Sequence, residues 1–165
     1  LGIEREVTIE VVEDRTQNRV HLTDANAWQP LAEANDSFPD HRPSELECPE
    51  NSYYPEGDAL EVETGYCNYL SLTQPSQAEI LEGDTLHLVL WHGDLGAVER
   101  ATGHAAITID GNLVWEETVD IPSRARIFDV RIPIDFDAPE GASIEYHLHN
   151  HGFNSWTLLQ LEVER

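Results

Sequence analysis

The segment Ser143–His149 alternates apolar and polar side chains with a period of two residues. An extended strand sends alternate side chains to opposite faces, whereas a helix, with about 3.6 residues per turn, does not. One face of this strand then carries the imidazoles of His147 and His149. The apolar side chains of its other face are Ile144, Tyr146 and Leu148. The pattern therefore predicts a strand with one buried face and one face that holds two neighbouring imidazoles.

The same alternation recurs along most of the chain. The segments that carry it, each bounded by turn residues, are Arg5–Val12, Val20–Leu22, Leu60–Thr64, Tyr66–Thr73, Thr85–His92, Gly103–Asp110, Leu113–Val119, Phe128–Ile134 and Ser155–Val163. Thr85–His92 is apolar on both faces, which indicates a central strand. No stretch has a convincing helical period, and Asp110-Gly111 is a strong hairpin turn. The chain is therefore predicted to be all-β, an antiparallel and jelly-roll-like β-sandwich of roughly eight to ten strands.

Between Asp24 and Asp58 the alternation disappears and prolines interrupt the sequence. We expect residues 24–58 to form a long loop excursion within a single domain that spans residues 1–165. Cys48 lies in this excursion and Cys67 lies just after it. A disulfide between them would stabilise the fold by roughly 3 kcal/mol, because it closes a loop in the unfolded chain. Two buried free thiols are the alternative.

The chain is strongly acidic. Its formal net charge is −23, from 32 acidic and nine basic residues, and every basic residue is Arg. Such a surface repels phosphate backbones and anionic lipids, which argues against nucleic-acid binding and membrane insertion. The acidity suits a saline environment, and the alternative is that it serves to concentrate cations. The chain contains no Met, so we expect that a targeting segment has been removed, and the cysteines favour an extracellular, periplasmic or cell-surface location.

Three short stretches carry a resemblance to a known fold family. They are Glu82-Gly83-Asp84-Thr85, Asp110-Gly111 before Leu113-Val114-Trp115, and His149-Asn150-His151-Gly152 with Trp156 and Leu161-Glu162-Val163. In its strand rhythm, the chain from about Ala59 onward resembles the galactose-binding-like jelly-roll modules that are appended to secreted bacterial enzymes and surface proteins. The resemblance implies a β-sandwich whose commonest role is to bind carbohydrate or a surface.

The closely spaced histidines near the C-terminus are candidate metal ligands. His147 and His149 share a strand face with Cα atoms roughly 7 Å apart, which lets two imidazoles reach one ion. His151 in the following turn, or His92 at the end of an earlier strand, would supply a third ligand, and His104 is a weaker candidate. Imidazole-rich sites suit copper or zinc, so these are the expected ions. The alternative is a polar sheet face whose histidines only form hydrogen bonds with their neighbours.

The same end of the chain also offers the components of a sugar groove. Such grooves combine an aromatic ring, which packs on the apolar face of a sugar, with planar polar groups that bond to its hydroxyls. The candidate ligand-binding residues are Trp156, Asn150, Asn154 and Asp94. The structural alternative for the two asparagines is turn geometry, and we expect Trp91 and Trp115 to pack in the core.

Catalytic signatures are absent from the sequence, which has no Gly-x-Ser-x-Gly motif, no evident Cys–His pair and no phosphate-binding glycine loop. Acidic residues are so abundant that no carboxylate pair indicates a glycosidase. The sequence therefore favours a non-catalytic β-sandwich that binds a small ligand or a divalent transition-metal ion through its C-terminal histidines. A carbohydrate-binding module is the alternative function, a structural domain for surface assembly is the third, and the oligomeric state is left open.

Overall fold

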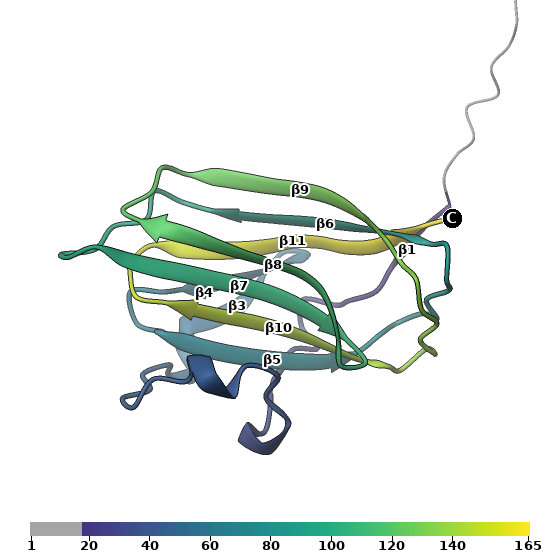
Figure 1. Ribbon diagram of the computed structural model, residues 1–165, viewed down its shortest axis with the longest axis horizontal. Coiled ribbons are helices and arrows are strands. Elements are labelled where there is room, and N and C mark those ends of the chain that lie inside the picture. The colour runs from purple at the N-terminus through teal and green to yellow at the C-terminus, as the bar shows by residue number, and fades with distance from the viewer. Residues whose placement is uncertain (1–17) are drawn as a thin grey trace, which may run out of the picture.

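Two antiparallel β-sheets pack face to face in the computed structural model, which describes residues 18–165 (Figure 1). The strand predicted at Arg5–Val12 lies outside the described residues. The first sheet, sheet A, has the spatial order β3 (Tyr53–Glu56), β4 (Ala59–Glu63), β11 (Ser155–Glu164), β6 (Thr85–His92) and β9 (Arg126–Pro133), and β1 (Arg19–His21) also pairs with β11. The second, sheet B, has the order β2 (Gln29–Pro30), β5 (Tyr69–Pro75), β10 (Ser143–Asn150), β7 (Ala101–Ile109) and β8 (Asn112–Ile121).

The prediction of an all-β jelly-roll sandwich is confirmed. Every alternating segment from Val20 onward forms a strand, with ends that shift by a few residues. Eleven strands occur in residues 18–165 rather than eight to ten, because the excursion contributes the short strands β2 and β3. Its other regular elements are three-residue 3-10 turns, namely η1 (Glu33–Asn35), η2 (Pro39–His41) and η3 (Glu50–Ser52). Within the described chain, no helix has the length and apolar character needed to cross a membrane.

The core lies between the two sheets and is built from alternate side chains of the central strands. β10 pairs with β5 on one edge and with β7 on the other, which fixes the direction of every side chain along it. Its inward residues are buried, as the period of two predicts, and His147 and His149 point to the outer side of sheet B. Leucine-sized side chains of this kind each contribute about 1.5–3 kcal/mol when removed from water. The facing core residues on β6 are Leu86, Leu88 and Leu90.

The hairpin that joins β7 to β8 turns at Asp110-Gly111, as predicted. Both residues have positive φ, 49° for Asp110 and 79° for Gly111. This conformation gives the turn the twist that two antiparallel strands need, and glycine adopts it without a steric cost. The turn therefore fixes β8 beside β7, which sets Glu116 of β8 opposite Ala106 and two register positions from His104.

The excursion folds back over sheet B. The disulfide between Cys48 and Cys67 is present, as predicted, and ties the excursion to the chain just before β5. Residues 33–42, which we call the strap, lie against the outer side of sheet B (Figure 1, dark blue, beside β5). The backbone N–H of Ser37 donates a hydrogen bond of 3.3 Å to the carboxylate of Glu145 on β10, and the Ser37 hydroxyl donates to the same carboxylate. The strap is therefore anchored to the central strand of the sheet.

Asp36 anchors the strap a second time, to β5. Its carboxylate accepts hydrogen bonds from the hydroxyl groups of Tyr69 and Ser71, the second at 3.2 Å. It also accepts the backbone N–H of Phe38 at 3.0 Å, and the guanidinium of Arg42 lies 3.4 Å away. Burial raises the pKa of Asp36, but these hydrogen bonds outweigh that effect and bring the pKa below its usual value. Asp36 is therefore a carboxylate anion enclosed between the strap and the sheet.

Candidate functional site

Four histidines lie together on the outer side of sheet B, next to the strap. His104 comes from β7, His147 and His149 come from β10, and His41 comes from η2. The strand register places His149 directly opposite His104, with His147 two residues earlier on β10. One ring nitrogen from each of His41, His104 and His147 lies within 4.8 Å of the other two. We call these four residues the histidine cluster.

Each member of the histidine cluster has a buried ring nitrogen without a hydrogen-bond partner in the part of the chain that the structure describes. These atoms are Nδ1 of His41, Nδ1 of His104, Nε2 of His147 and Nε2 of His149. Buried polar atoms in proteins almost always have a partner, and an unpartnered one costs about 1–3 kcal/mol. Four such atoms in one cluster therefore call for an explanation other than packing.

The hydrogen bonds of His147 fix which of its nitrogens carries the proton. Its Nδ1 lies 3.0 Å from the hydroxyl oxygen of Ser71, and that oxygen lies 3.2 Å from a carboxylate oxygen of Asp36. A hydroxyl has one proton, and the Asp36 anion can only accept, so Ser71 donates to Asp36. Ser71 must then accept the N–H of His147 Nδ1. The buried Nε2 of His147 is left with a free lone pair.

His104 is oriented by a carboxylate in the same way. Its Nε2 lies 3.0 Å from a carboxylate oxygen of Glu116 on β8. The carboxylate accepts, so Nε2 carries the proton, and in the neutral ring Nδ1 keeps a lone pair. That Nδ1 is the atom that is buried without a partner. Two imidazoles of the histidine cluster therefore have their unprotonated nitrogens on the buried side.

The strap shields the histidine cluster from water. The ring of Phe38 stacks on that of His147, with ring centres 4.4 Å apart and planes at 22°. Burial, aided by the nearby imidazoles of His104 and His41, lowers the pKa of His147 to about 3. Burial, followed by the neighbouring His151, lowers the pKa of His149 to about 4. Both rings are therefore neutral at neutral pH, and the neutral imidazole is the form that binds metals.

The structure brings together some of the predicted metal ligands and separates others. His147 and His149 share one face, and the ring of His151 lies 4.4 Å from that of His149. His104, the weaker candidate, belongs to the centre of the group, and His41 was missed because it lies in an aperiodic loop. His92 is elsewhere, because it is an inward residue of β6.

His92 packs inside the sandwich. Its ring centre lies 4.6 Å from that of Trp156 and 5.9 Å from that of Phe128, and its Nδ1 lies 2.7 Å from the carbonyl oxygen of Gly93. Sheet B therefore stands between this imidazole and the histidine cluster. The prediction that His92 and His147 bind the same metal ion is therefore wrong. His92 points into the core because alternate side chains on β6 point to opposite faces.

The predicted sugar-binding residues have structural roles in the described chain. Trp156 is 0% exposed, and its indole N–H donates to the side-chain oxygen of Asn150 at 3.2 Å. Asn154 has a φ of 114°, and its amide group donates to the carbonyl of Asp94 at 2.7 Å. The Asp94 carboxylate accepts the N–H of Ala125 at 2.7 Å. The sugar groove predicted from these residues is therefore not open, because the indole is buried and the polar groups bond to one another.

A second group of titratable residues lies on the outer side of sheet A. His87, Glu162 and Glu164 are buried and close enough to share an ion. Their charged groups are already paired, since Arg19 and Arg131 lie 3.3 Å and 3.2 Å from the Glu164 carboxylate. His87 lies 3.3 Å from Glu162. This group is an ion-pair network in which each carboxylate has an arginine neighbour, although Oε1 of Glu164 forms no hydrogen bond within residues 18–165.

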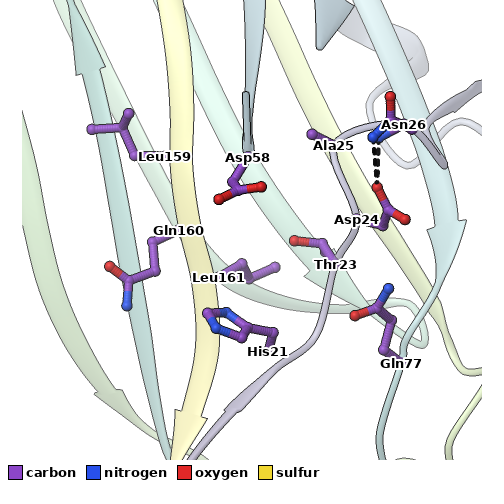
Figure 2. A pocket seen from close by; sticks show the side chains of 10 residues that line it. All are labelled: His21, Thr23, Asp24, Ala25, Asn26, Asp58, Gln77, Leu159, Gln160 and Leu161. Carbon is purple, nitrogen blue, oxygen red and sulfur yellow. Dashed lines mark hydrogen bonds between the residues drawn. The ribbon is translucent and has the colours of Figure 1, made fainter. Parts of the chain in front are cut away.

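A pocket of about 540 Å³ opens at one edge of sheet A (Figure 2). β6 occupies one edge of β11, so β4 and β1 share its other edge: β4 pairs as far as Leu158 and β1 pairs from Glu162 onward. The pocket lies in the gap between them, where β11 also has a bulge. Its lining residues are His21, Thr23, Asp24, Ala25, Asn26, Asp58, Gln77, Leu159, Gln160 and Leu161.

The lining of this pocket is mainly planar and polar. Asp24 and Asp58 supply carboxylates, and Asn26, Gln77 and Gln160 supply amides. The Asp24 carboxylate is held in place by the backbone N–H of Asn26 at 2.8 Å and by its side-chain amide at 3.1 Å. These hydrogen bonds lower the pKa of Asp24. No sequence signal marked the pocket, because its residues come from four separate segments and resemble ordinary turn residues.

A row of side chains crosses the outer side of sheet A close to the pocket. The strand register aligns Tyr54, Glu61, Thr157, Trp91 and Ile127 across five strands. Tyr54 is 38% exposed and Trp91 is half-buried, so Trp91 does not belong to the core as expected. Thr157 of this row and Leu159 of the pocket are two residues apart on β11, a separation of roughly 7 Å. The pocket and the two aromatic side chains therefore lie on the same side of the sandwich.

The chain is a jelly-roll β-sandwich with a strap against the outer side of sheet B and a pocket beside sheet A. No protein-family model matches the sequence, and no curated protein matches it. Solved structures do match. One is a carbohydrate-binding module of the CBM28 type, specific for non-crystalline cellulose, which is 12% identical with a TM-score of 0.52. The match covers 84% of this chain and 87% of that one.

Two further similar structures are also carbohydrate-binding modules. A CBM4 structure is 10% identical with a TM-score of 0.47, and the match covers 86% of this chain and 89% of that one. A family 11 module from Clostridium thermocellum, solved with a mixed-linked β-1,3-1,4 tetrasaccharide, is 10% identical with a TM-score of 0.34, covering 84% and 95%. At such identities the likeness to the CBM28 module is one of fold.

Proposed function

We propose that this protein is a non-catalytic, exported carbohydrate-binding domain. The observation that carries the proposal is the open pocket at the split edge of sheet A, in which two carboxylates and three amides surround aliphatic side chains. Sugar recognition needs several fixed planar acceptors and donors for hydroxyl groups, and it needs apolar groups for the C–H face of the ring. The pocket supplies both.

The neighbouring row on sheet A extends this surface. Tyr54 and Trp91 offer partly exposed aromatic rings, on which a sugar ring packs. The strap covers part of the outer side of sheet B, whereas the row on sheet A keeps two partly exposed aromatic rings. A polysaccharide chain that enters the pocket and continues across the row would contact both. The similarity in fold to carbohydrate-binding modules and the disulfide support the same function and an exported location.

The proposal is tested with a panel of soluble polysaccharides, including β-glucans, xylan and galactan, by affinity electrophoresis and then by calorimetry. We expect at least one to bind the wild-type protein. Asp58→Ala and Gln160→Ala should each weaken that binding by about tenfold or more, the loss expected when a sugar hydroxyl loses a charged or amide partner. Both residues line the pocket without a role in the core.

Glu99→Ala is the matched control, because Glu99 is an exposed acidic residue outside the pocket. It should leave the affinity unchanged. Absence of binding to every polysaccharide in the panel would refute the proposed function. Equal affinities for wild type, Asp58→Ala and Gln160→Ala would remove the pocket as its location.

A further inference from the structure

We propose that His41, His104 and His147 form a binding site for one divalent transition-metal ion, Cu²⁺ or Zn²⁺, between the strap and sheet B. The three imidazoles come from three separate elements, η2, β7 and β10, and meet at one place. This site lies on the opposite sheet from the sugar pocket, so it does not depend on the proposed function.

The nitrogen positions suit a single ion. A tetrahedral zinc ion holds histidine nitrogens at about 2.0–2.1 Å, which places the ligand atoms roughly 3.4 Å from one another. In the protein they lie within 4.8 Å of one another. Closing that distance needs small rotations of the rings. His41 lies in η2 of the strap and is not part of the hydrophobic core.

The free ring nitrogens of the histidine cluster have no hydrogen-bond partner in the described chain. The lone pairs of His104 Nδ1 and His147 Nε2 are buried, and neither atom has a hydrogen-bond donor nearby. A cluster stabilised only by hydrogen bonds would pair these atoms with N–H or O–H groups. A cation that accepts several lone pairs at once satisfies them all. The buried and unpartnered Nδ1 of His41 belongs to the same set.

The hydrogen-bond acceptors next to His104 and His147 are arranged as they are around histidine ligands in metal sites. Histidine ligands usually donate their second ring N–H to a carboxylate or another acceptor, which fixes the tautomer and the ring orientation. Here Glu116 accepts from His104, and Ser71, backed by Asp36, accepts from His147. In both imidazoles the nitrogen opposite this acceptor is buried and has no hydrogen-bond partner in residues 18–165.

The donor set selects the class of ion. The three ligands are imidazoles, which favour copper, zinc and nickel, whereas calcium and magnesium prefer oxygen ligands. Among divalent ions of the first row, copper binds such sites most tightly. A fourth donor is near, because His149 also has a buried unpartnered Nε2 and its ring centre lies 5.9 Å from that of His41.

The test is calorimetric titration of the metal-free protein with Zn²⁺ and with Cu²⁺. The chain has 32 acidic residues, so the titration is run in high salt with excess Mg²⁺ to suppress weak carboxylate binding. We expect one ion per chain with submicromolar affinity. Glu116→Ala removes an outer hydrogen-bond partner and should weaken the metal affinity by about 10- to 100-fold. His41→Ala removes a ligand and should weaken the metal affinity by more than that.

His21→Ala is the matched control, because this imidazole is 74% exposed and lies on sheet A. It should bind metal as the wild type does. His41 and Glu116 lie outside the core, so we expect both variants to fold. They test the site even if a variant of the buried His147 fails to fold. In the Cu²⁺ complex, electron paramagnetic resonance should show coupling to imidazole nitrogens.

Two results would overturn the proposal. One is an affinity of His41→Ala equal to that of the wild type. The other is metal uptake that Mg²⁺ displaces, with a copper spectrum that shows oxygen ligands alone.

Discussion

At the scale of single residues, histidine has different roles on the inner and outer sides of the two sheets. His92 and His147 are both fully buried imidazoles, yet one packs among aromatic rings in the core and the other faces a group of histidines. The difference arises from position along the strand, because alternate residues point to opposite sides. A pattern of histidines in a sequence therefore predicts shared faces within one strand, but not between strands of different sheets.

His92 links stability to pH. Burial lowers its pKa below the usual 6.5, so the folded state keeps the ring neutral at pH values where the unfolded chain binds a proton. The free energy of unfolding should therefore fall as the pH falls below about 6.5. In His92→Phe the free energy of unfolding should change less with pH. The difference in slope is up to about 1.4 kcal/mol per pH unit, the value for one proton.

The measurement is urea unfolding of wild type and His92→Phe between about pH 7 and pH 5, a range chosen around the usual histidine pKa. Only the slopes are compared, because the substitution also changes the packing against Trp156. Identical slopes for the two proteins would contradict the assignment.

Tyr54 tests the aromatic part of the sugar surface. Tyr54→Ala should weaken polysaccharide binding with little loss of stability, because the ring is 38% exposed on the edge strand β3. Loss of one stacking ring corresponds to about 0.5–1.5 kcal/mol beyond lost contact area. Affinity electrophoresis gives the change in binding, and thermal unfolding gives the stability. Tyr66→Ala is the control, since Tyr66 is 73% exposed and lies outside the row. Equal losses of polysaccharide binding in Tyr54→Ala and Tyr66→Ala would argue against a specific role for the row on sheet A.

At the scale of elements, the strap depends on two anchors and one covalent tie. Asp36 and Ser37 attach it to β5 and β10, and the disulfide between Cys48 and Cys67 closes the excursion behind it. Removing the disulfide should lower the free energy of unfolding by roughly 3 kcal/mol, because the two cysteines are 19 residues apart.

This prediction is checked with the double variant Cys48→Ser, Cys67→Ser by denaturant unfolding. The metal affinity should fall as well, because the excursion supplies His41 and its loosening adds an ordering cost to binding. Zinc should in turn stabilise the double variant more than it stabilises His41→Ala. A double variant as stable as the wild type would mean that the hydrogen-bonded anchors hold the excursion alone.

At the scale of the whole molecule, the dominant property is charge. The net charge of −23 opposes the compact state through repulsion among exposed carboxylates. The screening length falls from about 10 Å at 0.1 M salt to about 3 Å at 1 M. The thermal unfolding midpoint should therefore rise steeply with the first additions of NaCl and then level off.

Calorimetry over a NaCl series measures this effect. If screening causes the rise in the unfolding midpoint, the rise levels off at high salt. Exclusion of salt from the protein surface would instead raise the midpoint continuously with salt concentration. A midpoint independent of salt would show that repulsion is not significant. Size measurements on the same series test the assembly alternative, because screening would also permit self-association.

Local pattern alone determined the β-sandwich, the positions of its main strands along the chain, the hairpin at Asp110-Gly111 and the outward direction of His147 and His149. These features depend on side-chain periodicity and turn chemistry, which are encoded within a few neighbouring residues. Tertiary structure alone decided that His41 joins His104 and His147, that Trp156 is buried, and that β1 and β4 leave a pocket beside β11. Those arrangements bring together segments far apart in the chain, and a single sequence does not specify the register and packing that do so.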